Sequence, residues 1–358
     1  MCLGLLFAFQ KSNAQGTEIM VEKVIDHWLS LHNNFSSAKD AHGNYTIDLT
    51  LEAMMVYGNS KGTEKYLDLA KQVLALRGIS AEDTISYRSQ PFGSMNFLIG
   101  KYSENNNWFK GYVAESSKMR QEVARSEEGA IMINHQGGHY ILIDYLQEYA
   151  SRMAKTGFIT DDPEFYREAV QQYQIYKNIV QNPENGLYSQ GRGWLDDKSR
   201  LSPGAWSRGH GWLLRGLVTS MMYLPEEYRD ELLPILKEVV DSLQKVQSKD
   251  GMWYIMLHLP KSESYPDVSG TGMIAYYMSV AVREGWLSGK SYKRSIMKAH
   301  GRLKDFITES GQVLSSSKGP GPLYSTEEYI RYRPEIDEKH GFQGMIYGLL
   351  ARNIIESR

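Results

Sequence analysis

Two tryptophans, an arginine, a histidine and three glycines lie within eleven consecutive residues, Ser202-Pro203-Gly204-Ala205-Trp206-Ser207-Arg208-Gly209-His210-Gly211-Trp212. The tryptophans offer flat apolar faces, and Arg208 offers a permanent positive charge with a planar fork of hydrogen-bond donors. The glycines let a ligand come close to the backbone. Aromatic faces beside an arginine suit a sugar that carries a carboxylate. A tryptophan-rich helix start packed into the core is the alternative interpretation.

Helical periodicity extends outward from this stretch in both directions. Apolar residues recur at spacings of three and four, which predicts helices at 18–33, 46–58, 62–77, 91–102, 105–121, 137–155, 163–181, 206–223, 225–247, 268–286, 290–308 and 341–356. Strand patterns are short, around 187–189 and 252–256. Twelve helices with alternately short and long connections predict an all-α fold, an (α/α)6 barrel of six helical hairpins. A superhelical repeat array fits less well, because no motif recurs with a period of about 30–45 residues.

The long connections 182–205, 248–267 and 309–340 are rich in tyrosine, tryptophan, arginine and acidic residues. Function concentrates in long loops on a rigid scaffold, so we expect these loops on one side of a single catalytic barrel domain, residues 17–358. Residues 1–16 contain a short apolar stretch followed by small polar residues, a pattern typical of the end of a signal peptide. This remnant predicts a periplasmic or secreted protein. A disordered start of a cytoplasmic protein is the alternative.

Composition narrows the possible partners. The formal net charge is −2, so no basic field favours nucleic acid or an anionic membrane. No stretch reaches the roughly 18 apolar residues of a membrane span. Cys2 is the only cysteine, which excludes an intramolecular disulfide and a thiolate metal site. Tyrosine (24) and tryptophan (7) are abundant, as a carbohydrate cleft requires. We expect an oligosaccharide substrate and no cofactor; the oligomeric state is not indicated.

A second polar group contains Asn134, His135 and His139. On a helix, two histidines four residues apart share one face. A zinc-protease pair carries a glutamate beside the first histidine, but Gln136 stands there, which disfavours a metal site. We expect Asn134 and one or both histidines to form the floor of a polar pocket. Structural histidines with satisfied hydrogen bonds are the alternative.

Further candidates lie in the long connections. Asp196 or Asp197 could act as a general acid or base and Arg192 could neutralise a uronate, although adjacent aspartates are also common in turns. Ser269, at a helix start, could hold a ligand oxygen or simply cap the helix. Residues 324–334 form either a rim over the cleft or a solvated charged loop.

The motifs together resemble a known group of enzymes. They run from Asn185-Gly186-Leu187-Tyr188 through Trp194, Ser202–Trp212, Trp253-Tyr254 and Ser269–Met273 to Asp337–Gly341, and they cover nearly the whole chain after residue 20. This order resembles the unsaturated glucuronyl and rhamnogalacturonyl hydrolases, glycoside hydrolase families 88 and 105. The resemblance implies an (α/α)6 barrel that hydrates the C4=C5 double bond of a terminal unsaturated uronic acid. A carboxylic acid protonates the vinyl ether and activates water, which differs from two-carboxylate glycoside hydrolysis.

The resemblance also assigns roles. It places a family aspartate at Asn134, whose amide cannot transfer a proton as an acid does, so we expect the acid or base among His135, His139, His210 and Asp196, with Asn134 bonding the sugar. Substrate-binding residues are expected to include aromatic rings, cations and hydroxyls: Trp194, Trp206, Trp212, Tyr188, Tyr265, Arg192, Arg208 and Ser269.

Three functions follow from these residues. The leading one is a glycoside hydrolase acting on uronic-acid-containing oligosaccharides. The second is another reaction on the same barrel: a saturated β-glucuronidase, a sugar epimerase, or a polysaccharide lyase with a neutral histidine or tyrosine as base. The resemblance places a second family aspartate where Gln190–Gly193 stands. The third function is a non-catalytic carbohydrate-binding relative, which the loss of both expected aspartates would favour.

Overall fold

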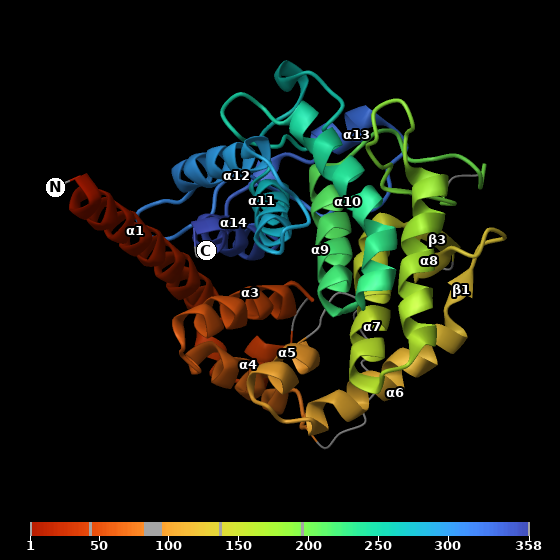
Figure 1. Cartoon of the computed structure of the whole chain (residues 1–358), viewed down its shortest axis with the longest axis horizontal. Coiled ribbons are helices and arrows are strands. Elements are labelled where there is room, and N and C mark those ends of the chain that lie inside the picture. Colours follow the sequence, from red (N-terminus) through yellow and green to blue (C-terminus); the bar gives the residue numbers. More distant parts are fainter. Residues whose placement is uncertain (1, 43–44, 82–94, 136–137, 195–196, 357–358) are drawn as a thin grey trace.

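The computed structural model describes residues 2–42, 45–81, 95–135, 138–194 and 197–356. Within these residues the chain forms six hairpins, each with an outer and then an inner helix (Figure 1): α1 (Cys2–Leu31) with α3 (Thr46–Lys61), α4 (Lys65–Leu76) with α5 (Met95–Tyr102), α6 (Asn107–Glu122) with α7 (Ile143–Thr160), α8 (Pro163–Val180) with α9 (Ser207–Tyr223), α10 (Glu226–Val246) with α11 (Val268–Arg283), and α12 (Lys290–Leu303) with α14 (Gly341–Glu356). The predicted (α/α)6 barrel is confirmed.

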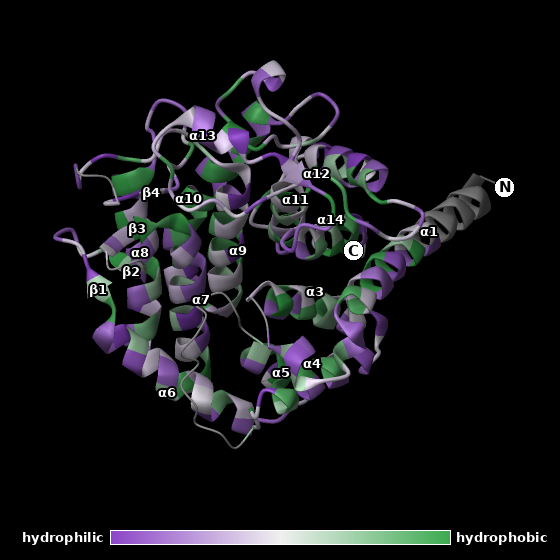
Figure 2. Ribbon diagram, turned by 180° about the vertical axis from the view of Figure 1, so that it is seen from behind, coloured by the Kyte–Doolittle hydropathy of each residue, from purple (hydrophilic) through white to green (hydrophobic). Residues whose placement is uncertain are grey.

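Burial separates the inner from the outer helices. Almost every residue of α7, α9 and α11 is buried, so these helices are enclosed on all faces, charged residues of α7 and α9 included. The outer helices α8, α10 and α12 bury one face only, and hydrophilic and hydrophobic residues alternate along them (Figure 2). This is the pattern of an amphipathic helix that covers a core. The predicted helices therefore form two classes, buried inner helices and amphipathic outer helices that cover them.

Two inner helices, α11 and α14, pack at very close range. A Cβ added at Gly272 of α11 would lie 1.8 Å from the backbone oxygen of Gly344 in α14, and a Cβ at Gly344 would lie 2.7 Å from the Cα of Ser269. Only glycine allows two backbones to approach this closely. The contact fixes the start of α11, and with it Ser269, against the start of α14.

Helix starts are capped as their sequences predict. Asp162 accepts a hydrogen bond from the Glu164 amide at the start of α8, where Pro163 follows the cap. Asp267 accepts from the amides of Ser269 and Gly270 at the start of α11. An aspartate at this position satisfies amides that have no partner within the helix. The capped ends set the entry points of the long connections.

Short strands occur where the sequence predicted helix. The segment expected as a helix over 137–155 contributes β3 (Gly138–Leu142) before α7 begins, and β3 pairs with β2 (Ile131–His135). Alternating apolar and polar residues with β-branched and aromatic side chains favour a hairpin here. The other strands are β1 (Ala124–Arg125) and β4 (Gly191–Arg192) beside them, and the separate pair β5 (Ser316–Ser317) and β6 (Pro334–Glu335). The strand patterns at 187–189 and 252–256 appear only as isolated bridges.

Short helices complete the described chain: α2 (Ala38–Ala41), α13 (Thr326–Arg331) and the 3-10 turns Asn33–Phe35, Lys261–Glu263 and Lys304–Phe306. The long connections that precede α9, α11 and α14 gather with α13 at one end of the molecule (Figure 1). Their predicted position on one side of the barrel is thereby confirmed. No helix in the described part of the chain combines the length and apolarity that a membrane span requires. Residues 2–16 belong to α1, and their assignment as a signal remnant stays a prediction.

Candidate active site

A cavity of about 240 Å³ lies at the end of the barrel where the inner helices begin. Its wall combines four aromatic rings, one amide, one imidazole, one carboxylate, one guanidinium, two aliphatic side chains and a proline-rich turn: Tyr45, Tyr140, Trp206, Trp212, Gln190, His340, Asp144, Arg208, Ile133, Leu142 and Gly319–Pro322. Asp144 stands in the first turn of α7 and Arg208 in the first turn of α9. The cavity thus brings together residues from distant parts of the sequence.

Asp144 is the residue that the sequence analysis missed. Its side chain is buried, and its Oδ2 has no hydrogen-bond partner among the described residues. Burial raises the pKa of Asp144 from 3.8 to about 7, although the positive charge of Arg208 and a hydrogen bond from Gln190 act in the opposite direction. Burial disfavours the charged form of a carboxylate. Near neutral pH this group can therefore both donate and accept a proton.

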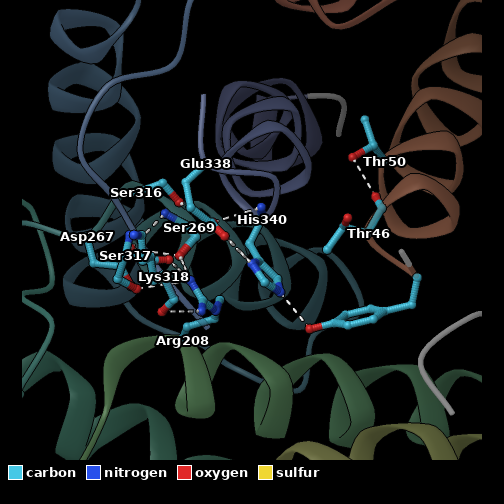
Figure 3. Close-up of polar contacts among 11 residues, drawn as sticks. Thr46, Thr50, Arg208, Asp267, Ser269, Ser316, Ser317, Lys318, Glu338 and His340 are labelled. Carbon is cyan, nitrogen blue, oxygen red and sulfur yellow. Dashed lines mark hydrogen bonds and ion pairs between the residues drawn. The ribbon is translucent and has the colours of Figure 1, made fainter. Parts of the chain in front are cut away.

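Arg208 is fully buried and held by neutral acceptors. Its Nη1 donates to Ser269 Oγ and Ser317 Oγ, both at 3.0 Å, and its Nη2 donates to the Lys318 carbonyl at 2.8 Å (Figure 3). Its guanidinium carbon lies 4.5 Å from the centre of the Trp206 ring. No ion pair joins it to a carboxylate in the part of the chain that the structure describes. A carboxylate on a bound sugar can supply this missing partner.

A hydrogen-bonded chain of three side chains, from Glu338 and His340 directly before α14 to Tyr45 directly before α3, reaches the cavity. His340 Nδ1 lies 2.9 Å from Glu338 Oε1, and its Nε2 lies 2.6 Å from the hydroxyl of Tyr45 (Figure 3 shows Glu338 and His340). Burial and the charge of Arg208 lower the pKa of His340 to about 4. The imidazole is therefore neutral. It donates from Nδ1 to Glu338 and accepts at Nε2 from Tyr45.

Glu338 remains charged in this chain. Burial acts to raise its pKa, but hydrogen bonds from His340 and the charge of Arg208 outweigh burial and lower the pKa to about 2. Burial raises the pKa of Tyr45 to about 12, against the charge of Arg208. Tyr45 consequently keeps its proton and presents a fixed hydroxyl oxygen to the cavity. A substrate hydroxyl can donate to that oxygen.

The expected pocket floor of Asn134 and His139 is wrong. These residues are direct cross-strand partners in the β2–β3 hairpin, and both are exposed. Their neighbours Ile133 and Tyr140 line the cavity instead. Successive residues of a strand point to opposite faces, so the hairpin turns Asn134 and His139 away from the site. His135 also lies on β2 rather than on a helix, and its side chain is outside the described residues.

His210 has a structural place rather than the expected catalytic one. It is fully buried, its Nδ1 donates to the Trp206 carbonyl at 2.8 Å, and its Nε2 accepts from the Tyr188 amide at 2.9 Å. Burial lowers its pKa to about 4. Both ring nitrogens are occupied by backbone groups, so no proton transfer to substrate is available. Tyr188 is also buried, with its ring edge-on to His210, and does not line the cavity.

The remaining candidates divide between the cavity and its surroundings. Trp206 and Trp212 line the cavity, as expected. Ser269 is not part of the cavity wall. Its hydroxyl donates to Asp267 at 2.7 Å and accepts from the Arg208 guanidinium, so Ser269 positions Arg208. Tyr265 packs against the cluster that contains Trp206 and is not part of the cavity wall.

The loop candidates that the structure describes lie outside the wall. Arg192 forms an ion pair with Glu128 at 2.8 Å. Its positive charge is therefore neutralised by a carboxylate of the protein and not, as expected, by a uronate. Trp194 is half-buried and does not line the cavity. Asp197 is exposed and accepts from the amide and hydroxyl of Ser199 in a turn. Asp196 lies outside the described residues.

The sequence matches the family model described as Glycosyl Hydrolase Family 88 over residues 18–347. It is 25% identical over 178 residues to an unsaturated 3S-rhamnoglycuronyl hydrolase of Alteromonas sp. (strain LOR), a match that covers 48% of this chain and 43% of that protein. It is 20% identical to the unsaturated rhamnogalacturonyl hydrolase YesR of Bacillus subtilis (strain 168), covering 74% of this chain and 76% of that protein. The match thus spans less than half of the first relative's length.

The fold has close counterparts among solved structures. A family 105 glycoside hydrolase of C. acetobutylicum ATCC 824 superposes with a TM-score of 0.79 at 20% identity, over 94% of this chain and 99% of that chain. This likeness establishes the shared barrel. Because the family model covers most of the sequence, the chain belongs to Glycosyl Hydrolase Family 88.

Proposed function

We propose that this protein hydrolyses oligosaccharides that end in a 4,5-unsaturated uronic acid, with Asp144 as both acid and base. One observation carries the proposal: a protonatable carboxyl group, whose Oδ2 has no hydrogen-bond partner among the described residues, lies in a cavity that also contains Arg208 without an ion-pair partner in the described chain. The names of the similar enzymes, which are unsaturated uronyl hydrolases, support this substrate class.

The substrate offers an enol ether to this acid. Asp144 donates its proton to C4, the electron pair of the C4=C5 double bond forms the new C4–H bond, and the ring oxygen stabilises the positive charge left at C5. The Asp144 carboxylate then takes a proton from water as the water oxygen bonds to C5. The resulting hemiketal opens to a ketone and the aglycone leaves from C1 as an alcohol. One water is consumed and Asp144 regains its proton, as general acid–base catalysis requires.

The pKa of Asp144 matches both steps. An acid with a pKa of about 7 is largely protonated below neutral pH and is still a usable base once it has lost its proton. Arg208 is placed to pair with the uronate carboxylate at C5, and the Trp206 and Trp212 rings form the apolar wall. The hydroxyl oxygen of Tyr45, fixed by its bond to His340, can accept from a sugar hydroxyl.

A two-carboxylate mechanism has less support. Retaining and inverting glycosidases place two carboxyl groups about 5–10 Å apart, and Asp144 is the one carboxylate among the described residues that line the cavity. A lyase is the second candidate, because the neutral imidazole of His340 accepts from the Tyr45 hydroxyl and could take up a sugar proton relayed through it. The two reactions have opposite optical signatures: a lyase creates the conjugated double bond and this hydrolase destroys it.

The test uses unsaturated disaccharides that polysaccharide lyases release from pectin, ulvan and glycosaminoglycans. We expect the ultraviolet absorbance of the conjugated uronate to fall on at least one of them, and Asp144→Asn to abolish that fall. Asp68→Asn, which changes an exposed aspartate in the first turn of α4, is the matched control. A rise in absorbance on the intact polysaccharides would establish the lyase instead, and silence on every substrate would overturn both catalytic proposals.

A further inference from the structure

A second and larger cavity, of about 560 Å³, lies at the opposite end of the barrel. The catalytic cavity is built from the beginnings of the inner helices, whereas this one is built from their later turns in α3, α5, α7, α9, α11 and α14. Asn59, Lys101 and Met222 on its rim are exposed, so the cavity opens to solvent. Nothing in the proposed reaction uses this space.

The charged residues that line this cavity are mostly cations. They comprise one carboxylate, Glu52, and five basic side chains: Lys61, Lys101, Lys155, Arg215 and Arg283. Three of these have carboxylate partners: Lys61 binds Glu18, Arg215 binds Glu52, and Arg283 binds Glu284. Lys101 donates to a neutral acceptor, the hydroxyl of Tyr223, at 2.9 Å.

Two of the cations reach the floor of the cavity. Lys155 and Arg215 are each 5% exposed, and Glu52 beside them is 2% exposed. Burial lowers the pKa of Lys155 to about 8, against the attraction of Glu52 and Glu148, so the amine is still largely charged at pH 7. The Nη1 of Arg215 is buried and has no hydrogen-bond partner among the described residues. A buried donor without a partner is costly, and an anionic ligand would satisfy it.

Tyrosine rings form much of the wall. Tyr276 stacks on Tyr347 with ring centres 4.3 Å apart, and Tyr277 meets both rings edge-on. Tyr102 and Tyr223 complete the aromatic lining. Tyrosine presents a flat apolar face and a hydroxyl, the two features that a sugar ring engages. The lining thus suits a ring-shaped, hydroxylated anion.

The helix dipole accounts for only some of the basic residues that line the cavity. Lys61, Lys101 and Arg283 stand in the last turns of α3, α5 and α11, where a cation balances the helix dipole. Lys155 stands five residues before the end of α7, and Arg215 eight residues before the end of α9. The dipole effect is confined to the terminal turn, so it does not account for these two cations, which lie beside the carboxylates of Glu52 and, for Lys155, Glu148.

We propose that this cavity is a second binding site, for an acidic mono- or disaccharide whose carboxylate or sulfate group contacts Lys155 and Arg215 and whose ring lies among the tyrosines. The site is independent of the reaction proposed above. Trp212 marks the boundary between the two sites: it lines the catalytic cavity, and Arg215 lies 5.6 Å from the centre of its ring.

Titration calorimetry of the full chain with D-glucuronate tests the proposal, with D-glucose as the neutral probe and inorganic sulfate as the anion without a ring. We expect Lys155→Met to weaken one glucuronate site at least about tenfold, the loss of one charged hydrogen bond. Lys61→Met, which removes a rim cation already paired with Glu18, is the matched control and should leave that site within about twofold. Both variants should retain catalytic activity.

Lysine acetylation of the unaltered protein locates the site even if Lys155→Met folds poorly. Glucuronate should slow acetylation of Lys101 at the rim and leave the exposed Lys118 unaffected, as read by mass spectrometry of each lysine. Equal protection by sulfate would overturn the saccharide assignment, and equal binding of glucose would overturn the anionic one. Unchanged acetylation of Lys101 at saturating glucuronate would remove the site altogether.

Discussion

Replacing Asp144 by asparagine should stabilise the protein at alkaline pH while it abolishes catalysis. Asp144 is 7% exposed, and burial raises its pKa from 3.8 to about 7. The folded state therefore holds a proton that the unfolded chain releases between pH 4 and pH 7. Over that range, the free energy of unfolding falls as pH rises, because the folded state binds more protons than the unfolded state.

The size of the effect follows from the two pKa values. A difference of about 3 pH units at 1.36 kcal/mol each corresponds to about 4 kcal/mol. This decrease in the free energy of unfolding, the penalty for burying the charged carboxylate, is absent below pH 4 and fully present above pH 7. Asparagine has nearly the same shape and no charge to bury, so the Asp144→Asn protein lacks the penalty. The stability difference between the two proteins should consequently grow by about 4 kcal/mol from pH 4 to pH 8.

Guanidinium unfolding of both proteins at a series of pH values measures this difference. Comparing the pair cancels other titrating groups, such as Glu148, whose pKa burial also raises to about 7. The exposed-residue variant Asp68→Asn should show no comparable pH-dependent gain. A stability difference between wild type and Asp144→Asn that is independent of pH would refute the assignment of Asp144 as a buried, protonated acid, and with it the proposed mechanism.

Four further substitutions probe the site and the scaffold. Tyr45→Phe leaves the Nε2 of His340 without its donor and should lower the free energy of unfolding by about 1–3 kcal/mol in guanidinium titration; an unchanged value would contradict the hydrogen bond. Arg208→Lys keeps the charge but loses the planar fork, so steady-state kinetics on an unsaturated uronide should show KM raised at least about tenfold. His210→Leu removes the partners of two buried backbone groups and should cost about 2–5 kcal/mol of stability with the pH profile of the residual activity unchanged, whereas a shifted profile would restore a catalytic role. Gly272→Ala would place a Cβ 1.8 Å from the Gly344 oxygen, and thermal unfolding should show a loss of several kcal/mol or no folded protein.

The helical framework could be read from the sequence because its signals are local. Periodicity of apolar residues and caps such as Asp162-Pro163 depend on neighbours within a few turns, and the predicted helices of the second half match the observed ones closely. Twelve helices with alternately short and long connections predicted the barrel topology, and the resemblance of the motifs implied the same fold. Of the site, Trp206, Arg208 and Trp212 were correctly placed, because all three lie on or directly before the same helix start.

Asp144 was not predicted as the acid, because its place in the site depends on where strand β3 ends and helix α7 begins. A helix was predicted over 137–155, the spacing of His135 and His139 suggested a shared face, and the resemblance placed the family aspartate at Asn134. The structure instead ends a hairpin at Leu142 and begins α7 at Ile143, which puts Asp144 in the first turn. The barrel fold brings Gln190 and Arg208 close to Asp144 in the cavity. No local sequence pattern indicates that these residues lie together.

The position of Asp144 also shows which physical effect controls the site. A carboxylate in the first turn of a helix is favoured by the helix dipole, by about 0.3–1 kcal/mol when exposed and up to about 2 kcal/mol when partly buried. Arg208 adds a second favourable charge. Both effects would keep an exposed aspartate ionised. Burial nevertheless prevails, because its cost corresponds to about 4 kcal/mol across the two pKa values. A helix start ordinarily favours a charged carboxylate, but in this barrel burial keeps Asp144 protonated up to near neutral pH. Burial, rather than a specific hydrogen-bond partner, therefore holds on Asp144 the proton that the proposed reaction needs.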